Sequence, residues 1–285
     1  MSFQIITDSC CDLPAQMVSD LELAVAPLSL EMDGRAYVSG EMSPKELYDH
    51  LRAGKLPKTS AVNPDGWSNM IRPALEAGRD VLVLAFSSGL SATYQSAVIA
   101  ADELREEFPQ RKLLVIDTLC AALGQGLLVY TAARLRSEGK SIEEVAAWIE
   151  AHKLNLCHWV TVEDLMHLKR GGRVSATTAV VGTMLSIKPL IRVDDNGKLE
   201  SYSKARGRKA AMNHLLDRMA ETFDPELSDT VFIAHGDCLA DAEQLAAEVK
   251  SRFGVKNVVI GYVGAVIGAH TGPGVLVLFH FGKHR

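Results

Sequence analysis

Residues 81–97 read VLVLAFSSGLSATYQSA, and this stretch decides the fold class. The run Val81–Phe86 is apolar at every position, which is typical of a strand that is covered on both faces. Ser87-Ser88-Gly89 ends that strand, and Ser91–Phe108 then has the pattern of a helix. Buried strands that alternate with helices predict a parallel sheet in an α/β layer.

The same alternation continues on both sides of this stretch. Asp33-Gly34 lies between the strand-like runs Leu23–Leu30 and Arg35–Ser39 and predicts a hairpin. Pro44–Arg52 is predicted to be a helix, with Ser43 as its N-cap. Four further elements are expected, two strands and two helices: Phe3–Thr7, Leu113–Ile116, Leu123–Ser137 and Ile142–Ala151.

The second half of the chain has a different pattern. Leu190–Val193 and Leu199–Tyr202 flank Asp194-Asp195-Asn196-Gly197, which is a second hairpin signal. The other expected elements are Trp159–Val162, Leu165–Lys169, Ser175–Ser186, Arg208–Phe223, Val231–His235 and Asp241–Phe253. We therefore expect an N-terminal α/β domain over residues 1–155, with a mainly parallel sheet flanked by helices. A C-terminal α+β domain with a mixed or antiparallel sheet is expected over residues 156–285.

Composition narrows the class of protein. The net charge is −5 with both signs interspersed, and the absence of a basic field argues against a nucleic-acid partner. Five cysteines without a CxxC motif predict neither a disulfide framework nor a zinc site, and they fit a reducing cytoplasm. A secretory signal is not expected, because a strand begins at once. Val258–Phe279 is long enough for a membrane span, but His270 and Gly272-Pro273-Gly274 interrupt it, so we expect two strands around a turn.

That turn is the first candidate for a functional site. Within Ala269–Gly274, glycine allows backbone angles closed to other residues and proline fixes its own, so the loop can hold the imidazole of His270 at one point. Thr59-Ser60 and Ser87–Ser91 can supply neutral donors, since ligands of open α/β sheets bind beyond the carboxyl ends of the strands. This combination suits one small anion. In the alternative interpretation the hydroxyls only cap helices and His270 is a satisfied turn histidine.

Enzymatic alternatives stay open at this point. No G-x-S-x-G, P-loop, G-x-G-x-x-G or HExxH motif occurs in the chain. Ser91 with His270 remains a possible nucleophile–base pair for a serine esterase or thioesterase, because such residues need not be close in sequence. Binding of another small acid is a third alternative. Glu163-Asp164 is not expected to bind a metal, because its side chains point to opposite faces of a strand and no third acidic ligand is near.

Two further features each allow a structural and a functional interpretation. Basic residues gather around Gly171-Gly172 (Arg170, Arg173) and again in Arg206, Arg208 and Lys209. They are either solvated charges or a docking surface or second anion site, since guanidinium groups pair well with carboxylate and phosphate. Ser175–Leu190 is nearly uncharged and rich in small residues, so it forms either a core helix or the wall of an apolar slot.

Five segments taken in order carry a resemblance to a known family. They are Thr7-Asp8-Ser9, Thr59-Ser60, the segment from Ser87 to Ala97, the segment from Leu168 to Arg173, and the segment from His270 to Gly274. With them the chain resembles the DegV family, the bacterial fatty-acid-binding proteins also called FakB, over essentially all of its 285 residues. The resemblance implies two α/β domains that hold a lipid between them.

The resemblance also implies a function and a set of residues. A fatty acid would lie with its tail in an apolar tunnel and present its carboxylate to a separate ATP-dependent fatty acid kinase, which makes acyl-phosphate for phospholipid synthesis. The carboxylate would be bound by Thr59, Ser60, Ser88, Ser91, His270 and Thr271. Of the two serines Ser88 and Ser91, one or both would contact the carboxylate. Arg170, and less directly Arg206, would dock the kinase. No catalytic residue, metal or cofactor is implied, and membrane contact would be transient at most.

Neutral donors suit such a head group. Hydroxyls and an imidazole satisfy a carboxylate through charge-assisted hydrogen bonds. They also leave an oxygen available for phosphoryl transfer, which a buried arginine would restrict. The expected site therefore contains no buried cation.

Overall fold

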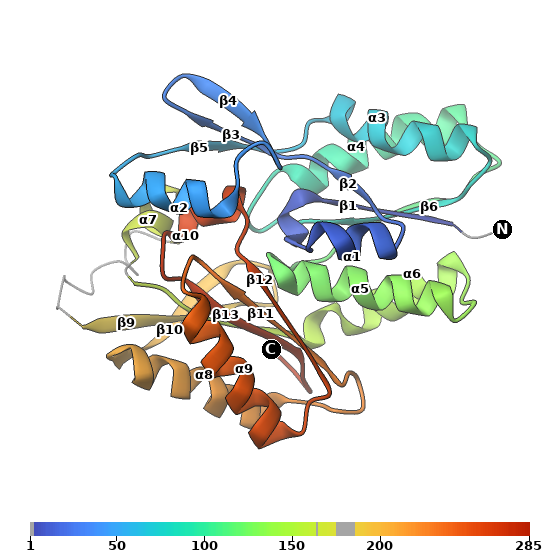
Figure 1. Cartoon of the computed structure of the whole chain (residues 1–285). Helices are drawn as coiled ribbons and strands as arrows, with labels where there is room; N and C mark the ends of the chain where they lie inside the picture. The colour runs from blue at the N-terminus through green and yellow to red at the C-terminus, as the bar shows by residue number, and fades with distance from the viewer. Residues whose placement is uncertain (1–2, 164, 175–185) are drawn as a thin grey trace.

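The first half of the chain is organised around a four-stranded parallel sheet (Figure 1). The computed structural model describes residues 3–163, 165–174 and 186–285. The strands lie in the order β2-β1-β6-β7, and each neighbouring pair is parallel. Their bounds are β1 (Gln4–Asp8), β2 (Ala24–Ala26), β6 (Val81–Ala85) and β7 (Leu113–Asp117). The parallel sheet predicted from the sequence is confirmed.

Helices cover both faces of this sheet, which is why β6 is apolar throughout. On one face lie α3 (Pro64–Glu76) and α4 (Thr93–Glu107), and on the other lie α5 (Leu123–Ser137) and α6 (Ile142–His152). Because successive strand side chains alternate, Val83 packs in the cluster of α3 and α4, whereas Leu82 and Leu84 pack in the cluster of α5 and α6. Three short helices complete this half: η1 (Ser9–Cys11), α1 (Ala15–Asp20) and η2 (Lys153–Asn155).

A small antiparallel sheet projects from this half. It contains β3 (Ser29–Met32), β4 (Arg35–Val38) and β5 (Lys58–Ser60) in the order β4-β3-β5. The predicted Asp33-Gly34 hairpin is confirmed, and both residues have positive φ (54° and 77°). The prediction of one strand over 23–30 is wrong, because Pro27 separates β2 from β3 and the two strands join different sheets.

The helix that follows this hairpin is the one predicted. It is α2 (Pro44–Arg52), and the Ser43 side chain accepts a hydrogen bond from the Glu46 backbone N–H at 3.2 Å. Proline at the first helical position costs no hydrogen bond, so the local chemistry alone defines this start.

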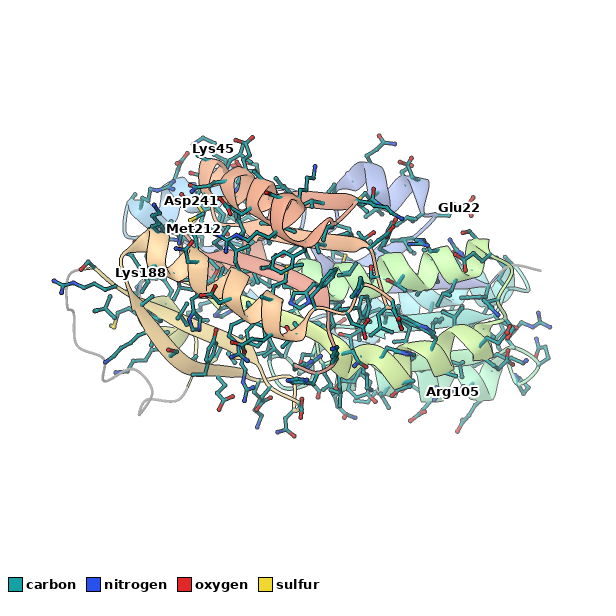
Figure 2. All side chains as sticks on the ribbon, turned by 90° about the horizontal axis from the view of Figure 1, so that it is seen from below. Glu22, Lys45, Arg105, Lys188, Met212 and Asp241 are labelled. Atoms are coloured by element: carbon teal, nitrogen blue, oxygen red, sulfur yellow. The ribbon has the colours of Figure 1, made fainter. Side chains whose placement is uncertain are left out.

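The second half forms a six-stranded mixed sheet, as predicted. Its order is β10-β9-β8-β13-β11-β12; β11 pairs with β12 in parallel, and the other neighbours pair antiparallel. Helices α8 (Arg208–Thr222) and α9 (Leu239–Phe253) pack on one face, where Met212, labelled in Figure 2, is buried. The strands are β8 (Leu156–Thr161), β9 (Ile187–Val193), β10 (Leu199–Arg206), β11 (Thr230–His235), β12 (Asn257–Tyr262) and β13 (Leu276–Phe281).

The two strands expected within residues 258–279 are present as β12 and β13, but the turn expected between them is wrong. A short helix, α10 (Ala265–Thr271), follows β12, and β11 lies between β12 and β13 in the sheet. His270 is therefore in the last turn of a helix and not in a loop. Within the ranges that the structure describes, no helix combines the length and hydrophobicity needed to cross a membrane.

The two halves share a core and are joined by a tight contact. The largest buried cluster contains Leu84 and Leu127 of the first half together with Val160 and Phe279 of the second. The β9–β10 turn is fastened to the loop after β6, since the hydroxyl of Ser87 donates to the Gly197 carbonyl at 2.8 Å. The division into domains at 155/156 stays a prediction.

One predicted element lies beyond this description. The helix expected over 175–186 falls, apart from Ser186, outside the described residues. The helical turn expected just before it is α7 (Met166–Arg170).

Candidate functional site

A cavity of about 250 Å³ lies between the two halves. Its floor is the inner face of the second sheet, where Val277 of β13, Val160 of β8 and Ile191 of β9 stand side by side in register. Its opposite wall comes from the first half and from α10. The wall side chains include Leu28, Phe86, Leu90, Ala121, Ala122, Val266 and Ile267. Most of the lining is apolar, so the cavity suits a hydrocarbon group.

Polar side chains also line the cavity, and two of them, Thr59 and His270, lie next to each other. Nε2 of His270 is 2.8 Å from the hydroxyl oxygen of Thr59. Thr59 is held by strand pairing, because it lies opposite Leu30 in the β3–β5 ladder. Two segments far apart in the sequence thus present one imidazole and one hydroxyl to the same space.

The imidazole is neutral at neutral pH. Burial lowers the pKa of His270 to about 4, and the positive charge of Arg173 adds to this effect. A neutral imidazole has one N–H donor and one acceptor nitrogen, so Nε2 of His270 can act as either donor or acceptor toward the Thr59 hydroxyl.

Gly171 fixes the other side of this ring. A Cβ atom at Gly171 would lie 2.1 Å from Nδ1 of His270, which no side chain can occupy. Gly171 caps α7 with an ordinary negative φ of −71°, so the glycine is required by the close approach of the ring and not by backbone angle.

Ser91 also lines the cavity. Its hydroxyl is 2.8 Å from the Thr93 hydroxyl and accepts the Thr93 backbone N–H at 3.2 Å, just before α4. The hydrogen bonds thus pair Ser91 with Thr93 and His270 with Thr59, and no Ser91–His270 bond is found in the described ranges. The nucleophile–base alternative gains no support from this arrangement.

The remaining predicted head-group residues divide into two sets. Ser60 and Thr271 line the cavity, and the Thr271 hydroxyl donates to the Ile267 carbonyl at 3.3 Å. Ser88 is exposed and is not part of the lining, and its backbone N–H donates to Asp117 at 3.2 Å. The structure therefore brings together Thr59, Ser60, Ser91, His270 and Thr271 and leaves Ser88 outside.

Arg173 is a cavity residue that the sequence did not reveal. Arg170, the other arginine beside the Gly171-Gly172 pair, is exposed at the end of α7. Gly172 has a φ of +71° and reverses the chain, so Arg173 turns inward and its Nε donates to the Leu90 carbonyl at 3.3 Å. Arg173 is half-buried, so a partly shielded cation lines the cavity beside the neutral donors, and the expectation of a site without a buried cation stays a prediction.

His158 is a second unexpected lining residue. Its Nδ1 is 3.1 Å from the Leu156 carbonyl, and its Nε2 accepts the Ala121 backbone N–H at 3.3 Å. Burial lowers the pKa of His158 well below its usual value, and the ring packs edge-on to Phe279 at 5.2 Å between centroids. Both ring nitrogens are used within the protein, so His158 behaves as an apolar wall.

Metal binding finds no support in the described part of the chain, where no group of three histidine, cysteine or acidic residues is placed to hold an ion. Glu163 instead forms ion pairs with Lys188 and with Arg208, and Asp164 lies outside the described residues. Burial raises the pKa of the Cys10 and Cys11 thiols well above the usual value, which agrees with their interpretation as small buried residues.

Comparison with known proteins identifies the family. The DegV family model matches residues 2–283. A DegV domain-containing protein of Clostridium perfringens is 44% identical over 286 residues, covering 99% of this chain and 98% of that protein. The chain belongs to the DegV family.

Solved DegV structures share the fold. A DegV family protein from Thermus thermophilus, described as fatty acid binding, has a TM-score of 0.88 and 32% identity, covering 99% of this chain and 100% of its own. A DegV lipid binding protein from Thermotoga maritima has a TM-score of 0.86 and 28% identity over the whole of both chains. The two-layered arrangement of this DegV chain is thus that of known lipid-binding relatives.

Proposed function

We propose that this DegV protein binds a long-chain fatty acid between its two halves. The hydrocarbon tail would lie in the apolar cavity, and the carboxylate would be bound by Thr59, Ser60, Ser91, His270 and Thr271. The observation that carries this proposal is a mostly apolar cavity whose lining also contains His270 hydrogen-bonded to Thr59. The relatives from Thermus and Thermotoga, described as fatty acid or lipid binding, support the same ligand class.

The tail supplies the affinity. Burying a methylene contributes about 0.8 kcal/mol, so about fifteen of them would contribute roughly 12 kcal/mol before the costs of association and ordering. The head group mainly selects the ligand, because a buried hydroxyl or imidazole left without a partner is costly. An aliphatic chain without a carboxylate would add no hydrogen bond to those that these groups already make within the protein.

The head group would be held by neutral donors with one cation nearby. Thr59 and Ser91 can each donate an O–H to a carboxylate oxygen, and His270 is neutral and supplies an N–H or an acceptor. Arg173 also lines the cavity and adds positive charge near His270. Because its guanidinium already donates to the Leu90 and Gly171 carbonyls, only its remaining N–H groups could donate to the ligand.

The protein would present the acid and not transform it. In this proposal an ATP-dependent fatty acid kinase docks beside the polar side chains of the cavity, and Arg170 and Arg206 contact it. Both side chains are exposed, Arg170 at the end of α7 and Arg206 at the end of β10. A separate kinase is required, because the bound acid itself carries no phosphoryl donor.

Native mass spectrometry tests the binding step. The delipidated protein is mixed with palmitate, oleate or hexadecanol, and the bound mass is recorded. We expect one molecule of either acid per chain and no retention of hexadecanol, which lacks the carboxylate. Equal retention of the alcohol, or no retention of any of these ligands, would contradict the proposal.

An esterase assay tests the alternative. We expect no turnover of a fluorogenic acyl ester by the purified protein. Turnover that is lost in Ser91→Ala would make this DegV protein an enzyme.

A further inference from the structure

The position of His270 depends on a helix that cannot be stable by itself. Helix α10 has seven residues, and isolated helices of that length do not persist in water. Its place is therefore set by what it packs against, which includes α2 and α7. The contacts that hold α10 decide whether His270 lies 2.8 Å from Thr59.

The start of α10 is held by two buried polar groups from the other half of the chain. The hydroxyl of Tyr48, on α2, donates to the Val263 carbonyl at 2.8 Å. The carboxyl of Asp12, just after η1, is hydrogen-bonded by the Gly264 backbone. A Cβ atom at Gly264 would lie 2.2 Å from Oδ1 of Asp12, so this contact has no room for a side chain.

The middle of α10 rests directly on α2. A Cβ atom at Gly268 would lie 2.7 Å from the Tyr48 hydroxyl oxygen and 2.9 Å from Cδ2 of Leu47. Gly264 and Gly268 are four residues apart and thus share one helix face. The backbone of that face lies directly against Asp12 and α2. These close contacts leave α10 little room to move.

The environment and the backbone conformation of Asp12 both lower the stability of the folded protein. Its Oδ2 is enclosed and has no hydrogen-bond partner among the residues that the structure describes. Its φ of +52° lies in the left-handed region, and burial raises its pKa well above the usual value. A buried polar atom without a partner and a strained backbone both cost free energy, and such features concentrate at functional positions.

We propose that Asp12 and Tyr48 are positioning residues that set His270 against Thr59 by fixing α10. They act through the helix and do not touch the ligand. This inference deepens the proposed function and rests on it for the binding readout. A displacement of α10 by about 1 Å would break the hydrogen bond between His270 and Thr59, because such bonds weaken rapidly beyond 3.2 Å.

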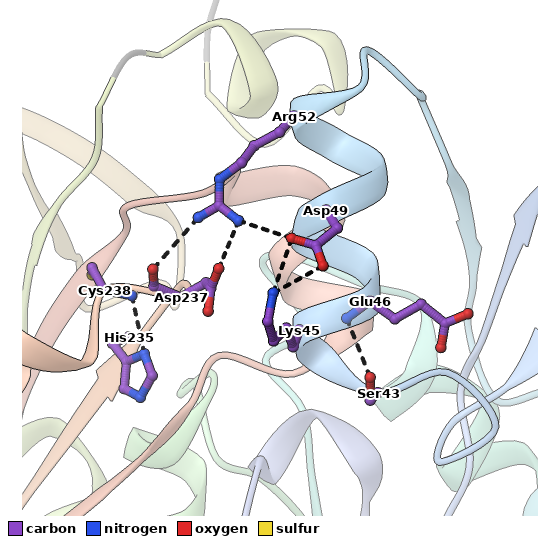
Figure 3. A network of polar contacts seen from close by, with 8 residues as sticks. All are labelled: Ser43, Lys45, Glu46, Asp49, Arg52, His235, Asp237 and Cys238. Atoms are coloured by element: carbon purple, nitrogen blue, oxygen red, sulfur yellow. Dashed lines mark hydrogen bonds and ion pairs between the residues drawn. The ribbon is translucent and has the colours of Figure 1, made fainter.

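Helix α2 also makes a surface contact that provides a matched control. Figure 3 shows Arg52 of α2 reaching Asp237, in the loop after β11, with Nη1 2.6 Å from Oδ2. The Arg52 side chain is 44% exposed, and exposed ion pairs contribute little to stability. Arg52→Ala therefore alters α2 without touching the buried contacts to α10.

The experiment combines nuclear magnetic resonance with ligand binding. Imidazole nitrogen resonances of His270, assigned by their loss in His270→Ala, are recorded for ligand-free protein, and palmitate affinity is measured separately. We expect Tyr48→Phe and Asp12→Ala to shift the His270 resonances and to weaken palmitate binding at least fivefold. Asp12→Asn should restore both, because its amide oxygen can accept the Gly264 N–H, and Arg52→Ala should match the unmodified protein.

Several outcomes separate this inference from its alternatives. Unchanged His270 resonances in Tyr48→Phe and Asp12→Ala overturn it, even if both variants are less stable. Weaker binding without a resonance shift overturns it as well. If Asp12→Ala does not fold, Tyr48→Phe decides. If the unmodified protein binds no palmitate but the resonances shift as expected, the positioning role holds and the proposed function fails.

Discussion

At the level of single side chains, the contact between Gly171 and His270 is the most demanding feature of the site. The ring approaches so closely that a Cβ atom would lie 2.1 Å from Nδ1. The imidazole is thus held between a glycine on one side and the Thr59 hydroxyl on the other. Steric exclusion and one hydrogen bond together give the ring a single orientation.

Gly171→Ala should displace the ring. We expect palmitate affinity to fall at least tenfold, which corresponds to about 1.4 kcal/mol. Isothermal titration calorimetry on delipidated protein measures it. Gly139→Ala is the control, because Gly139 has a φ of +87° and nothing within 4 Å of its Cβ position, so it adds backbone strain without a clash. Equal palmitate affinities for the two variants would show that the His270 ring can make room for the alanine side chain without loss of binding.

The low pKa of His270 predicts a dependence of stability on pH. In the unfolded chain the imidazole takes up a proton near pH 6.5, whereas in the folded chain it does so near pH 4. Its contribution is therefore present above pH 6.5 and is lost as the pH falls toward 4. The full effect is at most about 3 kcal/mol and is reduced by the partial exposure of the ring.

Urea unfolding at pH 7 and pH 4.5 measures that contribution. The loss of unfolding free energy between the two pH values should be smaller in His270→Gln, which cannot take up the proton. His284→Gln, at an exposed position, should behave as the unmodified protein. An identical loss in all three proteins would contradict a buried, neutral His270.

At the level of secondary structure, the link between the β9–β10 turn and the loop after β6 joins the two sheets. Ser87 is fully buried, and its hydroxyl both donates to the Gly197 carbonyl and accepts the Gly89 backbone N–H at 3.1 Å. The neighbouring Ser88 side chain is exposed. Two adjacent serines thus have very different structural roles.

Ser87→Ala and Ser88→Ala form a matched pair. Ser87→Ala should lower the unfolding free energy by about 1–3 kcal/mol, because the buried Gly197 carbonyl and the half-buried Gly89 N–H lose their partner. Ser88→Ala should change it by no more than about 0.5 kcal/mol. Chemical denaturation measures both values. Similar small changes in both variants would mean that water satisfies the Gly197 carbonyl.

At the level of the complete chain, the cavity lies between two layers that are otherwise well packed. A ligand that binds only the folded state stabilises it by about 2.7 kcal/mol at one hundred times its dissociation constant. A fatty acid in this position would therefore act as part of the core. The ligand-free protein should be measurably less stable than the loaded one.

Val277→Phe should occupy the ligand space. Val277 is central in the cavity floor, so the larger ring would fill the void and exclude the tail. We expect a folded protein whose Tm no longer rises with palmitate, as measured by scanning calorimetry. The control Val38→Phe, on the exposed strand β4, should keep the full rise. A normal rise in Val277→Phe would place the ligand elsewhere.

In the proposed function, docking of the kinase would depend on the surface and not on the cavity. Arg170→Ala should leave bound lipid unchanged in native mass spectra and lower the rate of acyl-phosphate formation by a purified fatty acid kinase at least tenfold. Arg105→Ala serves as the control, since Arg105 is exposed on α4 in the first half (Figure 2). Equal rates for both variants would remove Arg170 from the docking surface.

Much of the fold could be predicted, because the deciding features are local. The apolar run at 81–86, the Asp33-Gly34 turn and the Ser43 cap each identify an element through its own few residues. The parallel sheet of the first half was predicted from the alternation of strands and helices. The mixed sheet of the second half was predicted from its hairpin signal. The division at Pro27 was missed because the strand-like composition continues across it.

The candidate site was predictable only in part. The hydroxyls of Thr59 and Ser91 and the imidazole of His270 were found because polar groups stand out beside apolar runs and because of the family resemblance. Arg173 and His158 were missed, since composition does not show whether a cation turns inward after a glycine or whether a histidine is enclosed. No local pattern distinguishes Ser91, which lines the cavity, from the exposed Ser88.

Chain chemistry over short distances was enough to define most of the strands and helices, the two hairpin turns and the set of polar groups available for an anion. The three-dimensional arrangement alone decided that His270 ends a helix, that Gly171 supports its ring and that Asp12 and Tyr48 hold the start of that helix. The physical reason is the distance along the chain over which each kind of interaction acts. Backbone preferences and hydrophobic periodicity act over a few neighbouring residues, whereas a binding site is made by contacts between segments that only packing brings together.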